Sequence, residues 1–286
     1  MRKRPLLSVV VASTSSLDLL RECLTALRPQ CERASAELIV ARAGPEHIGE
    51  LARIAAGCAF VAAPAAATLP RVRGVGLSKA SGEWVALTED HCVADAGWIH
   101  ELMAAAHSSV HVLGGSMGNA RRERSIDCGA FFAEYGIYGG RQPTRPQLFA
   151  AANVAYHRHV IAEVVEGCAA GDWEDVIHDR LRATGREFLL VRSARVRQNT
   201  LHAVGAFCMR RFQHGRGYAR TRSRTLSRWR RAGQLAATPV LPPLLAARIL
   251  RVVDPEDERD FLRALPATLM FLAAWSLGEA VGYAMP

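Results

Sequence analysis

The sequence predicts an α/β fold with an open, mostly parallel sheet, followed by a C-terminal helical appendage that associates with a membrane. Three observations support this prediction. Strand-like and helix-like segments alternate along the first 115 residues, a strongly basic tract follows, and two apolar runs free of charged residues come near the end. With 286 residues, 50% apolar and 22% charged types, the chain can form one sizeable folded domain and an appendage.

The first apolar run, residues 6–12, is expected to be a strand buried on both faces of a parallel sheet. Basic residues precede it, so it imitates a signal peptide. It is only seven residues long, however, and charged residues follow on a helical pattern, which favours the buried strand. A helix capped by Ser15 or Ser16 should follow, with an apolar stripe from Leu17 to Leu27, and Pro29 is expected to end it.

The same alternation continues towards residue 115. Strands are predicted at residues 37–41, 58–62 and 84–87, and helices at residues 45–57 and 68–80. Open α/β sheets bind ligands beyond the carboxyl ends of their strands. Chemistry is therefore expected in the segment that follows residue 87, which reads Thr88-Glu89-Asp90-His91-Cys92.

Two acidic segments are candidates for this chemistry. If the first is extended, Glu89 and His91 project to the same side and suit Mn²⁺ or Mg²⁺, although such a turn can equally be a solvated one. The second is Asp172-Trp173-Glu174-Asp175, at the predicted start of a helix. Its acids can be helix caps, or one of them can accept a proton from an attacking hydroxyl.

The positive charge is concentrated in one tract. Residues 180–231 hold 15 Arg and one acid, so they carry +14 while the rest of the chain carries −5. Within the tract, Gln213 and Arg216 lie in a segment that can bind a diphosphate or lipid headgroups, or can be a merely solvated basic face. Few aromatic residues are available to stack on bases, so no nucleic-acid partner is predicted.

The two charge-free apolar runs, residues 232–247 and 264–278, are shorter than the roughly 20 residues of a spanning helix. Pro242 and Pro243 interrupt the first run and favour a re-entrant or interfacial helix. The alternative is a soluble helical subdomain. Seven scattered cysteines without a CxxC pair indicate a reducing compartment.

The order of these features resembles the inverting family 2 glycosyltransferases of the GT-A fold, in particular the bacterial members that associate with membranes. The segments that carry the resemblance are Arg73-Gly74-Val75-Gly76-Leu77, Gly82-Glu83-Trp84 leading to Glu89-Asp90-His91, Asp95-Ala96-Gly97-Trp98, Ala152-Asn153 and Trp173-Glu174-Asp175. The resemblance implies a GT-A domain at residues 1–200, a basic helical segment at 201–231 and a membrane-associating region at 232–286.

The resemblance also implies the chemistry. A nucleotide-sugar donor would contact Ser13, Thr14, Arg73, Glu89, Asp90, Gln213 and Arg216. A divalent cation, Mn²⁺ or Mg²⁺, would be held by Glu89 and His91, and Glu174 and Asp175 would be the catalytic pair, with Asp175 as the base. The implied function is sugar transfer to a membrane-proximal or lipid-linked acceptor, for surface polysaccharide or glycolipid synthesis, at the cytoplasmic face of the bacterial inner membrane.

Two departures from the family pattern leave alternatives open. The acidic pair expected after the second strand is Ala41-Arg42, so the carboxylate that would read the nucleotide base is missing, and the metal motif ends in His91. Two other functions are therefore considered. The first is a catalytically degenerate GT-A protein that acts as a binding module, and the second is a basic module that binds a membrane or a nucleic acid.

Overall fold

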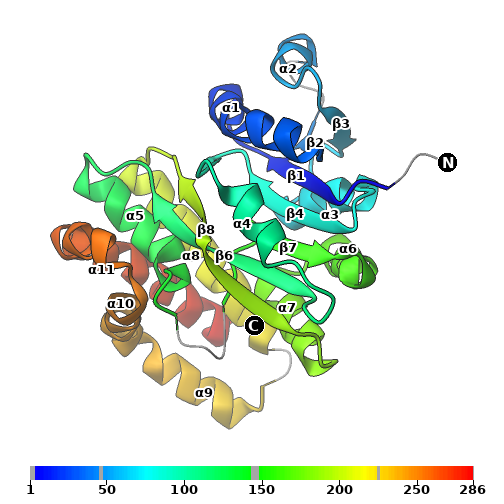
Figure 1. Ribbon diagram of the computed structural model, residues 1–286. Helices are drawn as coiled ribbons and strands as arrows, with labels where there is room; N and C mark the ends of the chain where they lie inside the picture. Colours follow the sequence, from blue (N-terminus) through cyan, green and yellow to red (C-terminus); the bar gives the residue numbers. More distant parts are fainter. Residues whose placement is uncertain (1–3, 45–47, 143–147, 224–225, 286) are drawn as a thin grey trace. The chain divides into compact units, whose positions relative to one another are not determined.

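The computed structural model describes residues 4–44, 48–142, 148–223 and 226–285. The chain divides into two compact units, one of Met1–Ala120 with Thr144–Asn199 and one of Arg121–Pro143 with Thr200–Pro286 (Figure 1). The first unit ends at Asn199. Arg121–Pro143, which the sequence prediction placed in the first domain, belongs to the second unit.

The first unit is built on an eight-stranded mixed sheet with the order β3-β2-β1-β4-β7-β6-β8-β5. Strands β1 to β4 are parallel, β7 runs antiparallel to β4 and β6, and β5 runs antiparallel to β8. The strands are β1 (Leu7–Ser13), β2 (Glu37–Ala43), β3 (Ala59–Ala63), β4 (Trp84–Glu89), β5 (Cys92–Ala94), β6 (Val112–Asn119), β7 (Asn153–His157) and β8 (Phe188–Gln198).

Helices cover this sheet. The largest core cluster joins alternate residues of the central strands, such as Val10 and Leu87, to Val72 of α3, Val164 of α6 and Leu181 of α7. Helix α1 packs on β1 and β2 and contacts α4. The helices of this unit are α1 (Leu17–Ala34), α2 (Ile48–Ile54), α3 (Leu69–Lys79), α4 (Trp98–Ala104), η2 (Arg158–Val160), α6 (Ile161–Ala170) and α7 (Glu174–Ala183).

The predicted elements of the first 90 residues are present, with two differences. Pro29 does not end α1, which continues to Ala34. A proline inside a helix costs about 3 kcal/mol, and contacts beyond it offset that cost: Cys31 is buried, and Gln30 accepts a hydrogen bond from the amide of Ile99. Strand β4 extends to Glu89 because Thr88 and Glu89 pair with β1. The predicted helix start at Pro45 lies outside the described residues.

The second unit consists of helices. Helix α11 packs along α8 and α5, and two glycines allow close approach of the backbones. A Cβ at Gly278 would lie 2.0 Å from the carbonyl oxygen of Phe212, and a Cβ at Gly215 would lie 2.2 Å from that of Trp275. The elements are α5 (Ser125–Tyr135), η1 (Gly136–Tyr138), α8 (Val204–Ser223), α9 (Arg228–Ala237), η3 (Thr238–Val240), α10 (Leu241–Val252) and α11 (Pro255–Ala284).

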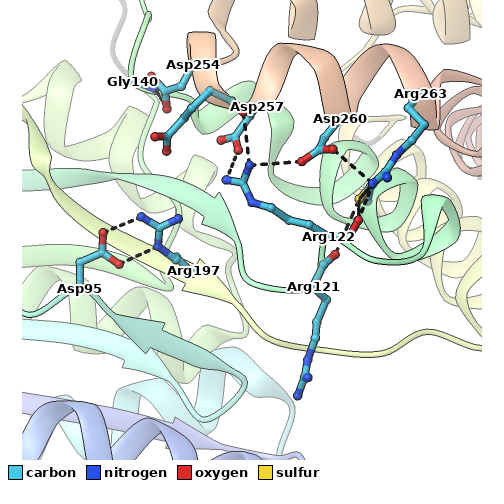
Figure 2. A network of polar contacts seen from close by, with 11 residues as sticks. Asp95, Arg121, Arg122, Gly140, Arg197, Asp254, Asp257, Asp260 and Arg263 are labelled. Atoms are coloured by element: carbon cyan, nitrogen blue, oxygen red, sulfur yellow. Dashed lines mark hydrogen bonds and ion pairs between the residues drawn. The ribbon is translucent and has the colours of Figure 1, made fainter.

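An arginine ties the start of α11 to the chain before α5 in this unit. Figure 2 shows Arg122 between Asp257 and Asp260, with 3.2 Å between its Nη1 and the Asp260 carboxylate. Asp257 is buried, so its charge requires this partner. The ion pairs fix the first two turns of α11.

Two stretches of this unit, Arg228–Val252 and Pro255–Ala284, are long and apolar enough to cross a membrane, judged by length and composition alone. Both stretches are longer than the charge-free runs predicted from the sequence, because a membrane-spanning helix can contain one or two charged residues. In the first stretch 22% of the apolar window is buried inside the protein, and in the second 39%. The second stretch is the more buried of the two.

Candidate functional site

The sheet changes direction of winding between β1 and β4, and this point lies at its carboxyl edge. From β1 the chain continues outward to β2 and β3, whereas β4 pairs on the other side of β1. In open α/β sheets the crevice outside such a switch point is the usual ligand site. Ser13, Arg42 and Glu89 stand at or next to the ends of β1, β2 and β4.

Asp90 is the centre of a buried hydrogen-bond group at this edge. One of its carboxylate oxygens accepts from the Ser13 hydroxyl at 2.8 Å and from the backbone amide of Ser15 at 2.7 Å. Burial opposes ionisation of Asp90, but His91 and these hydrogen bonds outweigh it and hold the pKa of the carboxyl below its usual value. Asp90 is therefore ionised and fixes the loop after β1.

Arg73 of α3 joins the two acidic segments. Its Nη2 lies 2.5 Å from Oε1 of Glu89, and its Nη1 lies 3.1 Å from Oε2 of Glu174, the first residue of α7. Arg73 and Glu89 are both buried. Segments that lie about 85 positions apart in the sequence thus meet through one guanidinium group.

His91 lies against both neighbouring carboxylates. Its Nδ1 is 3.6 Å from Oε2 of Glu89 and 3.7 Å from Oδ1 of Asp90. Burial works against a charge on His91, but its neighbours, Asp90 and Glu89 among them, raise its pKa well above the usual value. Imidazole binds metals in its neutral form, so His91 would have to lose a proton to act as a ligand.

The donor atoms at this edge fit a divalent cation that also binds a substrate phosphate. Oδ1 of Asp90 is buried and has no hydrogen-bond partner among the described residues. Within the same residues no cluster of three or more His, Cys, Asp or Glu side chains forms a complete metal cage. Mg²⁺ and similar ions in phosphate sites need only one or two carboxylates, with phosphate and water supplying the other ligands. The residues present meet that requirement.

Asp175 lies in the first turn of α7, directly after Glu174. Its side chain is exposed to solvent. Partial burial of the carboxyl by the surrounding protein raises its pKa above the usual value of an aspartate. An accessible carboxylate with a raised pKa is a suitable proton acceptor.

Two contacts at this site were not predicted from the sequence. Arg42 donates from Nη1 to the Ser13 hydroxyl at 2.6 Å and to the carbonyl of Ser15 at 3.0 Å, and lies 3.9 Å from Asp90. The Trp173 ring stacks on the guanidinium of Arg73, with 5.5 Å to the ring centroid. The sequence contains one signal for the contacts of Arg42, namely its position near the end of the predicted second strand.

Three other residues were predicted to contact the donor. Thr14 is exposed in the loop after β1. Gln213 and Arg216 lie on α8 of the second unit. Their assignment to a donor site remains a prediction.

Two of the family-like segments brace the sheet. The amide of Asn153 accepts from the indole nitrogen of Trp98 at 2.8 Å and donates to the carbonyls of Ser116 and Ala194. Asp95 pairs with Arg197 through two contacts of 2.7 and 2.9 Å (Figure 2). These contacts fix β7 and β8 beside β6 and the loop after β5.

No family model matches the sequence, and no curated protein matches it. Among solved structures, the chain is similar to a mannosyltransferase from Pyrobaculum calidifontis in complex with GDP-Man and Mn²⁺. The two are 15% identical, with 97% of this chain and 88% of that chain covered and a TM-score of 0.57. The chain has the GT-A fold.

A weaker likeness is to glucosyl-3-phosphoglycerate synthase from Mycobacterium tuberculosis in complex with Mn²⁺, UDP-glucose and glycerol 3-phosphate. It is 14% identical, with 72% of this chain and 76% of that chain covered and a TM-score of 0.47. The GT-A fold, with its mixed sheet and its C-terminal helices, agrees with the fold class predicted from the sequence.

Proposed function

We propose that this protein is an inverting glycosyltransferase of family 2 that moves a sugar from a nucleotide-sugar donor to a hydroxyl acceptor. The observation that carries the proposal is the pairing of Arg73 with both Glu89 and Glu174. This pairing joins the two acidic segments through one guanidinium, which supports the assignment of both segments to one site. The likeness to a mannosyltransferase that holds GDP-Man and Mn²⁺ supports both the donor class and a divalent cation, Mn²⁺ or Mg²⁺.

In the proposed mechanism Glu89 and His91 would hold the cation, with Oδ1 of Asp90, which lies 3.7 Å from His91, beside them. The cation, when bound, neutralises charge on the departing diphosphate. Ser13 and the amide of Ser15 keep Asp90 in position, and Arg73 keeps Glu174 at the start of α7.

Asp175 acts as the general base of this mechanism. It accepts the proton of the acceptor hydroxyl while the hydroxyl oxygen forms a bond to the anomeric carbon. The bond from that carbon to the diphosphate oxygen breaks, and the electron pair leaves with the diphosphate. One such displacement inverts the anomeric centre. A positioned general base contributes about 10²- to 10⁴-fold to the rate.

The acceptor in this proposal is membrane-proximal or lipid-linked, and the setting is polysaccharide or glycolipid synthesis at the cytoplasmic side of the inner membrane. Support comes from the second unit, which combines most of the basic tract with two stretches apolar enough for a membrane. Transfer measured with a lipid-linked and with a soluble acceptor should favour the lipid-linked one.

The decisive experiment compares Asp175→Asn with Asp179→Asn. Asp179 lies one turn further along α7, is exposed, and pairs with Arg182, so its variant removes a carboxylate of the same helix that has no assigned role. Release of nucleoside diphosphate from a panel of sugar donors is measured with Mn²⁺ and with a chelator. Asp175→Asn should reduce transfer about 10²- to 10⁴-fold and leave donor binding intact, whereas Asp179→Asn should change neither. Transfer by Asp175→Asn within a few-fold of the wild type would remove Asp175 from the role of base.

A further inference from the structure

A continuous apolar stripe is exposed along α9, η3 and α10. We name it the α9–α10 stripe; its members are Trp229, Ala232, Leu235, Ala236, Val240, Leu244, Ala247 and Leu250. All eight side chains are exposed. Most of them recur at intervals of three or four residues, so they follow one side of the helical path. Trp229 is 88% exposed and Leu244 is 61% exposed, and monomeric soluble proteins rarely expose large contiguous apolar patches.

The opposite side of the same segment packs on the second unit. Thr238, Ala246 and Ile249 are buried. Helix α10 contacts α11 and η1, and α9 and η3 contact α11. The segment is therefore held by the protein on one side, and the stripe is the side that the protein does not cover.

The charges on this segment have a single sign. Residues 228–252 contain five arginines and no aspartate or glutamate. Arg228 and Arg230 lie beside Trp229 at the start of α9, and Arg248 and Arg251 lie near the end of α10. Apolar side chains flanked by arginines are the pattern of helices that lie in the headgroup region of a membrane. Each arginine near an anionic surface adds about 1 kcal/mol of attraction.

We propose that the α9–α10 stripe docks in the plane of an anionic lipid bilayer. The segment does not span it. The charge-free part, residues 232–247, would cover about 24 Å as a straight helix, against about 30 Å of hydrocarbon. The path also bends, because η3 separates α9 from α10 and two prolines stand in the first turn of α10.

Docking is tested by flotation of the full chain with vesicles, in the absence of donor and acceptor. The vesicles are made of phosphatidylcholine alone or with 30% phosphatidylglycerol. We expect flotation with the anionic vesicles only, reduced by 0.5 M salt because salt screens surface charge. Since no substrate is present, the result is independent of the proposed enzyme activity.

Variants separate the apolar contribution of the stripe to membrane binding from the electrostatic contribution of the arginines. Leu244→Glu should abolish flotation by placing a charge in the stripe, and the triple variant Arg228→Gln, Arg230→Gln, Arg231→Gln should weaken partitioning about 100-fold. The matched control is Leu201→Glu, at a residue of the same unit that is 58% exposed and lies outside the stripe. It should float like the wild type.

Trp229 reports the depth of insertion. Lipids brominated near the headgroup should quench tryptophan emission more than lipids brominated near the chain ends, and Trp229→Phe should remove that difference. Stronger quenching from the chain ends would show a spanning segment and overturn the proposal. So would equal flotation of wild type and Leu244→Glu, flotation independent of anionic lipid, or a wild-type dimer in solution that Leu244→Glu converts to monomer.

Discussion

Replacement of Arg73 by methionine tests whether this side chain holds the site together. Methionine keeps much of the length and the apolar stem of arginine but removes the guanidinium. The change leaves Glu89 and Glu174 without their shared partner. Glu89 is 2% exposed, so its charge would stay in a region that water scarcely reaches.

The expected loss of stability follows from this burial. Removal of one partner from a buried ion pair costs about 3–5 kcal/mol, because the other charge remains buried. The side chains of Arg73 and Glu89 are 6% and 2% exposed. That of Glu174 is 18% exposed, so water can solvate its carboxylate in part and lowers the cost of leaving it unpaired. We therefore expect about 3 kcal/mol. For a unit of this size that is a fall in Tm of roughly 6–12 °C.

The measurement is urea unfolding and calorimetry of the whole chain, with Arg71→Met as the control. Arg71 lies two residues earlier on α3 and is exposed, so its replacement should change stability by less than about 0.5 kcal/mol. Adding Glu89→Gln to Arg73→Met should recover part of the loss, because a neutral amide costs less to bury than an unpaired carboxylate. If Arg73→Met is as stable as Arg71→Met, Arg73 does not neutralise these carboxylates and the reasoning fails.

Three further predictions concern protons and packing. The rate of transfer should rise with pH as Asp175 loses its proton, with a midpoint above the usual pKa of an aspartate because burial raises it; a midpoint at the usual value would contradict this. Burial lowers the pKa of His178 to about 3, so the folded state disfavours its charged form and stability falls as the pH drops below about 6.5. Between pH 7 and 4.5, the free energy of unfolding measured with urea should fall by about 2–3 kcal/mol more for the wild type than for His178→Gln. Gly278→Ala should lower the Tm of the protein, since a Cβ would meet the Phe212 carbonyl, whereas Gly217→Ala, with open space on α8, should not.

The sheet could be predicted from the sequence because local signals and burial agree there. The run at residues 6–12 is almost entirely apolar, and the structure places β1 inside the sheet, between β2 and β4, with a buried pattern throughout. Pro29 shows where a local signal fails, since tertiary contacts of Gln30 and Cys31 extend α1 beyond it. The assignment of Arg121–Pro143 to the second unit had no signal in the sequence, because it depends on packing of α5 against α11.

The site was predictable in its residue types and less so in their contacts. The resemblance pointed to Arg73, Glu89 and Glu174 as candidate site residues, but not to the contacts by which one guanidinium joins the other two. Such a contact depends on how α3 and α7 sit over the sheet, and a one-dimensional pattern does not contain that information. Arg42 was noted only as the residue that replaces a carboxylate, and its hydrogen bonds to Ser13 and Ser15 came from the fold.

The two departures from the family pattern act in the same direction on the charge of this edge. Arg42 stands where a carboxylate is expected, and His91 ends a motif that usually ends in a carboxylate. The ionised Asp90 is consequently flanked by two groups of opposite charge. An edge with fewer negative charges attracts a divalent cation less strongly, but it also repels an anionic diphosphate less. In the proposed mechanism these departures would place part of the charge that faces an anionic diphosphate on the protein rather than on the cation.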